Sequence, residues 1–154
     1  ALEVLEILRR QEIVDALAEE FGPFDLDACA RADTTKAPYY YDKEMDGLQQ
    51  PWVGRVWMNP PYSDPGPWLQ KATQEVREGR ALCVVAFLPA ATDTGWFHTR
   101  IWDETLNRPR PGVTVRFRRG RVRFLGWQGT PIGSPKAGTI IAIFTPPKES
   151  VCPS

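Results

Sequence analysis

One run of apolar residues constrains the fold of this chain more than any other feature of its sequence. Residues 81–88 read Ala-Leu-Cys-Val-Val-Ala-Phe-Leu, and Pro89 follows directly. The run has the length of a strand and almost no polar alternation, which is typical of a central strand buried on both faces. Such a strand needs helices on both sides of its sheet, so the run predicts an α/β fold.

The other segments predict an open sheet that is parallel in its first half and antiparallel at its end. Apolar residues at helical spacing predict helices over residues 11–21, 67–79 and 93–106. Shorter apolar runs predict strands over residues 24–29, 55–58 and 139–144. Apolar and basic residues alternate over 113–125, which predicts a β-hairpin, and residues 31–51 are expected to be mostly loop.

Length and composition favour one soluble domain over residues 1–154. Apolar residues make up 42% of the chain and charged residues 25%, as in ordinary globular proteins. No apolar run is long enough to span a bilayer, so we expect a cytoplasmic protein. The three cysteines form no C-x-x-C pair and His98 is the only histidine, so we expect no metal site and no Ser-His-Asp triad.

The charges are divided between the two halves of the chain. Residues 1–66 contain 6 Lys or Arg and 13 Asp or Glu, whereas residues 67–154 contain 13 and 6. Eight arginines lie between Arg100 and Arg123. Arg119, Arg121 and Arg123 lie at two-residue intervals, so they would share one face of a strand and could neutralise phosphates. Together with Arg116 of the same predicted hairpin, they are the candidate DNA-binding residues. A solvated strand face is the alternative interpretation of the same residues.

The most specific motif is Asn59-Pro60-Pro61-Tyr62, which directly follows a predicted strand. Two successive prolines fix an extended backbone, and the segment lies where open α/β sheets bind their ligands. The Asn59 side-chain oxygen and the Pro60 carbonyl can each accept a hydrogen from a planar amine, and the Tyr62 ring can stack on a base. These properties suit methyl transfer to an aromatic amine, whereas a proline-rich turn with a packed tyrosine is the structural alternative.

Several segments in fixed order extend the motif to a family resemblance over about residues 12–144. They are Phe21-Gly22-Pro23-Phe24-Asp25-Leu26-Asp27-Ala28-Cys29-Ala30, Asp46-Gly47-Leu48, Pro51-Trp52, Gly54-Arg55-Val56-Trp57-Met58 before the motif, Gly66-Pro67-Trp68, Leu88-Pro89-Ala90, Thr92-Asp93-Thr94, Trp96-Phe97, Arg119-Gly120-Arg121 and Phe124. With these segments the chain resembles the phage-type DNA N-6-adenine methyltransferases and, more broadly, the amino-methyltransferases with an Asn/Asp/Ser-Pro-Pro-Tyr/Phe motif.

The resemblance implies a Rossmann-like methyltransferase fold, S-adenosyl-L-methionine (AdoMet) as methyl donor, and DNA as substrate, with the target adenine flipped from the duplex. It implies a phage- or prophage-encoded protein that acts in the bacterial host, and in so short a chain a short or relaxed sequence preference. Its catalytic residues would be Asn59, Pro60, Pro61 and Tyr62. Its cofactor-binding residues would be Asp25, Asp27, Ala28 and Ala30, with Asp46 as a further candidate.

One departure from the family pattern lies near the N-terminus. Enzymes of this kind commonly carry a Thr-Pro pair that helps to close the cofactor site, whereas this chain has Arg9-Arg10. This departure keeps open a nucleic-acid-binding module that has lost catalysis. Because the Asn-Pro-Pro-Tyr motif suits any planar amino group, methylation of the cytosine amine and methylation of a glutamine amide in a protein also stay open.

Overall fold

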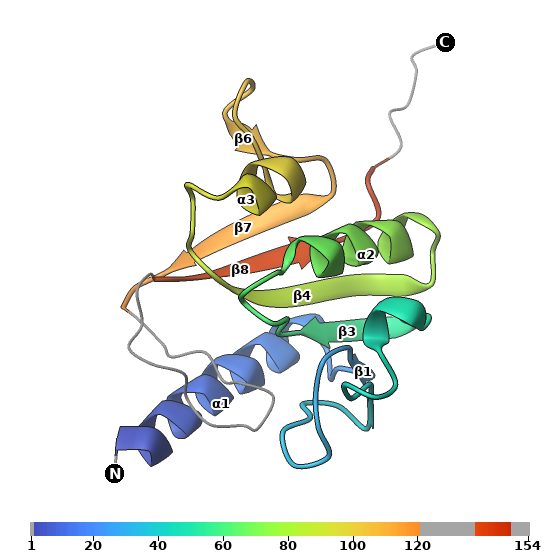
Figure 1. Cartoon of the computed structure of the whole chain (residues 1–154), viewed down its shortest axis with the longest axis vertical. Helices are drawn as coiled ribbons and strands as arrows, with labels where there is room; N and C mark the ends of the chain where they lie inside the picture. Colours follow the sequence, from blue (N-terminus) through green and yellow to red (C-terminus); the bar gives the residue numbers. More distant parts are fainter. Residues whose placement is uncertain (1, 121–137, 149–154) are drawn as a thin grey trace.

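A six-stranded mixed sheet forms the centre of the computed structural model, which describes residues 2–120 and 138–148. Helix α1 (Leu2–Phe21) covers one face of this sheet, while α2 (Gly66–Arg77) and α3 (Gly95–Arg100) lie on the other (Figure 1). The strand order is β2-β1-β3-β4-β8-β7. The α/β class and the open mixed sheet expected from the sequence are confirmed.

The first four strands in this order are parallel, and the last two pairings are antiparallel. The strands are β1 (Leu26–Asp27), β2 (Tyr39–Tyr40), β3 (Gly54–Met58), β4 (Ala81–Pro89), β7 (Val113–Arg118) and β8 (Thr139–Phe144). A short 3-10 helix, η1 (Gly47–Gln49), precedes β3. Strand β4 lies inside the sheet and is almost entirely buried, as its apolar run predicts.

Alternate residues of the central strands pack against different layers. On β4, Val85 and Phe87 belong to the core on the α1 side, whereas Val84 belongs to the core on the α2 side. On β3, Trp57 faces α1 and Met58 faces α2. This period of two is the strand period, so each strand supplies apolar side chains to both cores of a three-layer structure.

The helices differ in length from the expectations. Helix α1 begins at Leu2, not near residue 11. Its first turns expose Val4, Leu5 and Leu8, so they have no amphipathic pattern from which the sequence could predict a helix. It ends as predicted at Gly22, whose φ of 83° is left-handed. The helix expected over residues 93–106 was partly wrong, since only α3 is helical there.

A small antiparallel pair replaces the second half of that expected helix. Strand β5 (Trp102–Asp103) pairs with β6 (Arg108–Pro109), and Asn107 has a φ of 51° in the turn between them. Asparagine tolerates this left-handed conformation better than most residues, which favours the turn over a continued helix. The pair projects beyond α3 (Figure 1).

The strand expected over residues 24–29 was also too long. Strand β1 ends at Asp27, because the N–H of Cys29 bonds the Asp27 side chain at 3.3 Å and turns the chain away from the sheet. In the hairpin expected over residues 113–125, the first strand corresponds to β7, which pairs with β8. The residues expected to form the second strand lie largely outside the described ranges. None of the helices in the described ranges is long and apolar enough to cross a membrane.

Candidate active site

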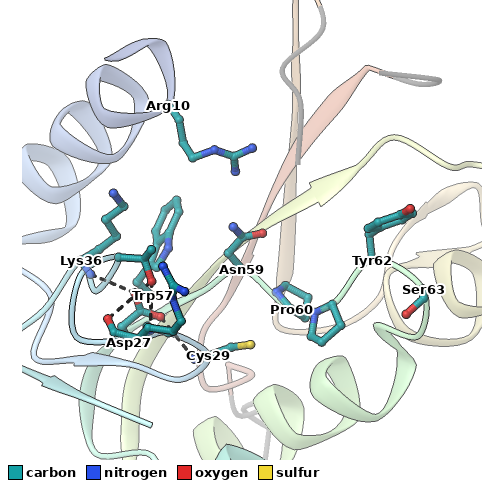
Figure 2. A pocket seen from close by; sticks show the side chains of 13 residues that line it. Arg10, Asp27, Cys29, Lys36, Trp57, Asn59, Pro60, Tyr62 and Ser63 are labelled. Atoms are coloured by element: carbon teal, nitrogen blue, oxygen red, sulfur yellow. Dashed lines mark hydrogen bonds between the residues drawn. The ribbon is translucent and has the colours of Figure 1, made fainter. Parts of the chain in front are cut away.

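A cavity of about 270 Å³ opens at the carboxyl edge of β1 and β3, on the side of the sheet that α1 covers (Figure 2). Open α/β sheets bind their ligands at this edge. The cavity is lined by Arg10, Asp27, Cys29, Ala30, Arg31, Thr34, Lys36, Trp57, Asn59, Pro60, Pro61, Tyr62 and Ser63.

Strand register explains why distant residues meet here. Asp27 is the partner of Trp57 across the parallel β1–β3 ladder. Side chains of paired residues lie on the same face of a sheet, and Asn59 follows Trp57 by two residues. Asp27 of β1 and Asn59 after β3 therefore line the same cavity. The sequence alone predicts them separately, Asp27 as a cofactor-binding candidate and Asn59 as a catalytic candidate.

Asp27 is the buried acid of the cavity, with 2% of its surface exposed. Its carboxyl group accepts backbone N–H bonds from Lys36 at 2.9 Å and Cys29 at 3.3 Å. Burial raises the pKa of Asp27 to about 7, and the two N–H bonds offset only part of this effect. The group is thus poised to become negative near neutral pH, and a cationic ligand beside it would favour the charged form.

The Asn59-Pro60-Pro61-Tyr62 segment forms the opposite border of the cavity. The Pro61 carbonyl accepts the N–H of Asp64 at 3.3 Å and begins a turn before α2. Among the hydrogen bonds of the described residues, none involves the Asn59 amide or the Pro60 carbonyl. Both groups are held by a rigid backbone and have acceptor capacity for a ligand.

Tyr62 lies at the mouth of the cavity, with 47% of its surface exposed. Figure 2 shows its ring beyond Pro60, on the side away from Asp27. An exposed ring in this place offers a stacking surface for a planar ligand.

Arg10 is a buried cation of the cavity and reaches into it from α1 (Figure 2). Only 2% of its surface is exposed, and its guanidinium carbon lies 4.7 Å from the centroid of the Phe87 ring. Phe87 in turn packs against Trp57, and Trp57 against Phe24, with centroid separations of 6.2 and 5.5 Å. These packed rings hold Phe87 in place, and the face of the Phe87 ring stabilises the guanidinium cation.

The loop after β1 closes the remaining side. Lys36 donates from its Nζ to the Gln11 side chain at 2.7 Å, and burial lowers the pKa of Lys36. Arg31 forms an ion pair with Asp33 at 2.6 Å. Burial, and then the neighbouring Asp27 charge, raise the pKa of the Cys29 thiol, so this cysteine lines the cavity as a neutral group.

The structure separates the remaining candidate residues into two groups. Ala30 lines the cavity, whereas Ala28 is fully buried beneath it. Asp25 and Asp46 do not line it: Asp25 accepts the backbone N–H of Arg55 at 2.8 Å, and Asp46 caps η1 through the N–H of Leu48 at 3.2 Å. Both carboxylates therefore stabilise local turns in this structure.

The described arginines of the candidate DNA surface lie on or just after the edge strand β7. Arg116 donates to Glu20 of α1 at 2.8 Å and lies 5.2 Å above the Phe21 ring. Arg119 is exposed and comes directly after Arg118, the last residue of β7. Through the ladder Arg118–Thr139–Pro89, that end of β7 lies at the same edge of the sheet as the cavity. Arg121 and Arg123 lie outside the described residues.

Sequence reasoning missed the cavity residues Arg10, Trp57 and Lys36. For Arg10 a signal existed: it lies three, four and seven residues before Ile13, Val14 and Leu17, which are all buried. It thus occupies an apolar helical stripe, where an arginine is rare unless it is paired or bound. Lys36 gave no such signal, because only the folded loop brings it to Asp27.

Fold and site together define an α/β protein with helices on both faces of its sheet and a cavity at the carboxyl edge of its parallel strands. Residues 9–151 match the family model described as DNA N-6-adenine-methyltransferase (Dam). Since this match spans nearly the whole sequence, the chain belongs to the family of adenine-specific DNA methyltransferases, whose reaction is methylation of N6 of adenine in DNA.

Two curated relatives are phage proteins described as DNA N-6-adenine-methyltransferases. The protein of Escherichia phage T1 is 28% identical over 167 residues, which cover 94% of this chain and 69% of the phage protein. The protein of Haemophilus phage HP1 is 41% identical over 76 residues, which cover 48% of this chain and 43% of that protein. A solved structure from Pyrococcus horikoshii, described as a candidate RNA methyltransferase, has a TM-score of 0.44 at 17% identity, covers 73% of this chain and 52% of its own, and is too distant to add to the assignment.

Proposed function

We propose that this chain transfers a methyl group from AdoMet to the exocyclic amine of adenine in DNA, with the acceptor amine held by Asn59 and Pro60. The observation that supports this most directly is the pairing of two unused acceptors with a buried acid. The Asn59 amide and the Pro60 carbonyl border the same cavity as Asp27.

The acceptors suit an aromatic amine because such an amine has two hydrogens and a delocalised lone pair. The Asn59 side-chain oxygen would accept one hydrogen, and the Pro60 carbonyl would accept the other. With both hydrogens held, the nitrogen lone pair points toward the cavity. Positioning of this kind supplies a large part of the rate when reacting atoms are held at attack distance.

The residues at the other end of the cavity fit the methyl donor. AdoMet supplies an electrophilic methyl group on a sulfonium. Asp27 is an acid close to the cavity wall that would balance a cationic ligand, and Ala30 leaves room beside it. In this proposal Asp27 and Ala30 bind the donor, while Ala28 supports the segment from beneath and Asp25 and Asp46 shape its flanking turns.

The adenine would leave the duplex to reach this cavity, because its amine is inaccessible to a buried methyl donor while the base is stacked. Tyr62 would receive the flipped base on its exposed ring. Arg119, at the same edge of the sheet, would contact the phosphate backbone, and Arg116 would join it only if it left Glu20.

The decisive experiment is an incubation with labelled AdoMet and DNA, followed by digestion and identification of the methylated nucleoside. The expected product of the native chain is N6-methyladenine. Asn59→Ala should lower the rate at least about a hundredfold, because acceptor positioning is lost, while leaving donor affinity unchanged.

The matched control is Asn107→Gly, which alters an asparagine in the β5–β6 turn and keeps its left-handed backbone. This variant should retain the native rate. N4-methylcytosine as the product would assign the cavity to the cytosine amine. Label found in protein would indicate a glutamine acceptor, and donor binding without any transfer would indicate a lapsed enzyme.

A further inference from the structure

Two side chains of opposite charge are buried against the same cavity. Arg10 and Asp27 are each 2% exposed, and both line it. Within the described ranges the other buried charged residue is Glu75, which is paired with Lys71 at 2.6 Å and with Arg80. A buried carboxyl group and a buried guanidinium that line one cavity suit a ligand that carries both charges.

We propose that Arg10 binds the carboxylate of the methionine part of AdoMet, while Asp27 faces its cationic part. This inference rests on the proposed function, since it assigns a role within the same cavity. AdoMet combines a carboxylate with an ammonium and a sulfonium, so it needs both partners.

The surroundings of Arg10 prepare it for this role. Its guanidinium lies over the Phe87 ring at 4.7 Å, which orients the plane of the cation and limits its freedom. A guanidinium plane offers parallel N–H donors that match the two oxygens of a carboxylate. Figure 2 shows the guanidinium directed to the side of the cavity that Asn59 borders, with Asp27 on another wall.

Arg10 is more deeply buried than the neighbouring cation Arg31: 2% of the Arg10 surface is exposed, whereas the Arg31 side chain is 33% exposed. Arg31 is paired with Asp33, and Lys36 donates its Nζ to Gln11. Lys36 also lies on the Asp27 side of the cavity, since its backbone N–H bonds that carboxyl group. Arg10 and Asp27 thus lie on different walls of the cavity, which suits the oppositely charged ends of one ligand.

Calorimetric titration with AdoMet and with decarboxylated AdoMet tests the proposal without any turnover. The native chain should bind AdoMet roughly ten- to a hundredfold more tightly, which is the effect of one charge-assisted hydrogen-bonded pair. Arg10→Met should abolish this preference and Arg10→Lys should keep part of it. Arg31→Met, at the same cavity, should retain the native preference.

The outcomes separate this inference from the proposed function. Equal affinity of the native chain for both donors would overturn the role of Arg10 alone, whereas binding of neither would overturn the proposed function as well. A preference that survives in a folded Arg10→Met variant would also refute the inference. So would an Arg10→Met variant that keeps the preference but loses affinity for an adenine-containing oligonucleotide, since the bound oxyanion would then be a phosphate. If Arg10→Met fails to fold, the two donors on the native chain and on Arg10→Lys decide the matter.

Discussion

Replacement of Asp27 by asparagine should stabilise the free protein above neutral pH. The pKa of this carboxyl group rises from 3.8 in an unfolded chain to about 7 in the fold. The folded state therefore holds the proton more tightly, and its stability falls as the pH rises from about 4 to about 7. At about 1.4 kcal/mol per pH unit, the full loss is about 4 kcal/mol, and Asp27→Asn should not show it.

The measurement is urea unfolding of both proteins at pH 5 and pH 8 without ligand. Between these two values the native chain crosses about two pH units of the sensitive range, so the stability advantage of the variant should grow by about 3 kcal/mol. An asparagine oxygen can still accept one of the two N–H bonds that Asp27 receives, as a protonated carboxyl group does. Asp25→Asn is the control, because that carboxylate is exposed.

An equal change in the free energy of unfolding from pH 5 to pH 8 for the native chain and Asp27→Asn would refute the reasoning. It would mean that burial does not raise the pKa of Asp27. Addition of AdoMet at pH 8 gives a second test. The donor should raise the stability of the native chain, whose ionised Asp27 then faces a cation, and should stabilise the variant far less. Such a result would identify Asp27 as a residue retained for binding at the expense of stability.

Two further predictions concern the contact between η1 and Ala28 and the DNA surface. A Cβ on Gly47 would lie 2.3 Å from the Ala28 carbonyl oxygen, so Gly47→Ala should lower the free energy of unfolding by about 1–3 kcal/mol, whereas Gly95→Ala, with no neighbour within 4 Å, should not. Urea unfolding distinguishes the two. Arg119→Ala should reduce the slope of log affinity for duplex DNA against log salt by about 1, and Arg77→Ala, an exposed arginine near the opposite edge, should leave the slope unchanged.

Strands with a strong local pattern could be predicted from the sequence. The run over residues 81–88 became β4, and residues 139–144 became β8, because buried central strands carry their signal in consecutive apolar residues. The Asn59 segment could be placed at the ligand edge for a similar reason, since the prolines end a strand wherever the strand lies.

Features that depend on tertiary contacts could not be predicted in the same way. The extension of α1 to Leu2 has no amphipathic signature, and the β5–β6 pair depends on one left-handed asparagine. The two charged walls of the cavity were separated by 17 residues of sequence, and only the packing of α1 on the sheet brings Arg10 to Asp27. Periodicity identifies which face of a helix is buried but not which ligand an arginine on that face meets.

The ladder between β1 and β3 also determines where this chain can change in length. Because Asp27 is aligned with Trp57, a single residue inserted within either strand would reverse its alternation and turn Asp27 or Asn59 toward α2. Insertions in the connection over residues 42–45, before η1, would leave that alignment intact. Length variation among related proteins is therefore expected to accumulate in this connection, while the spacing within each strand stays constant.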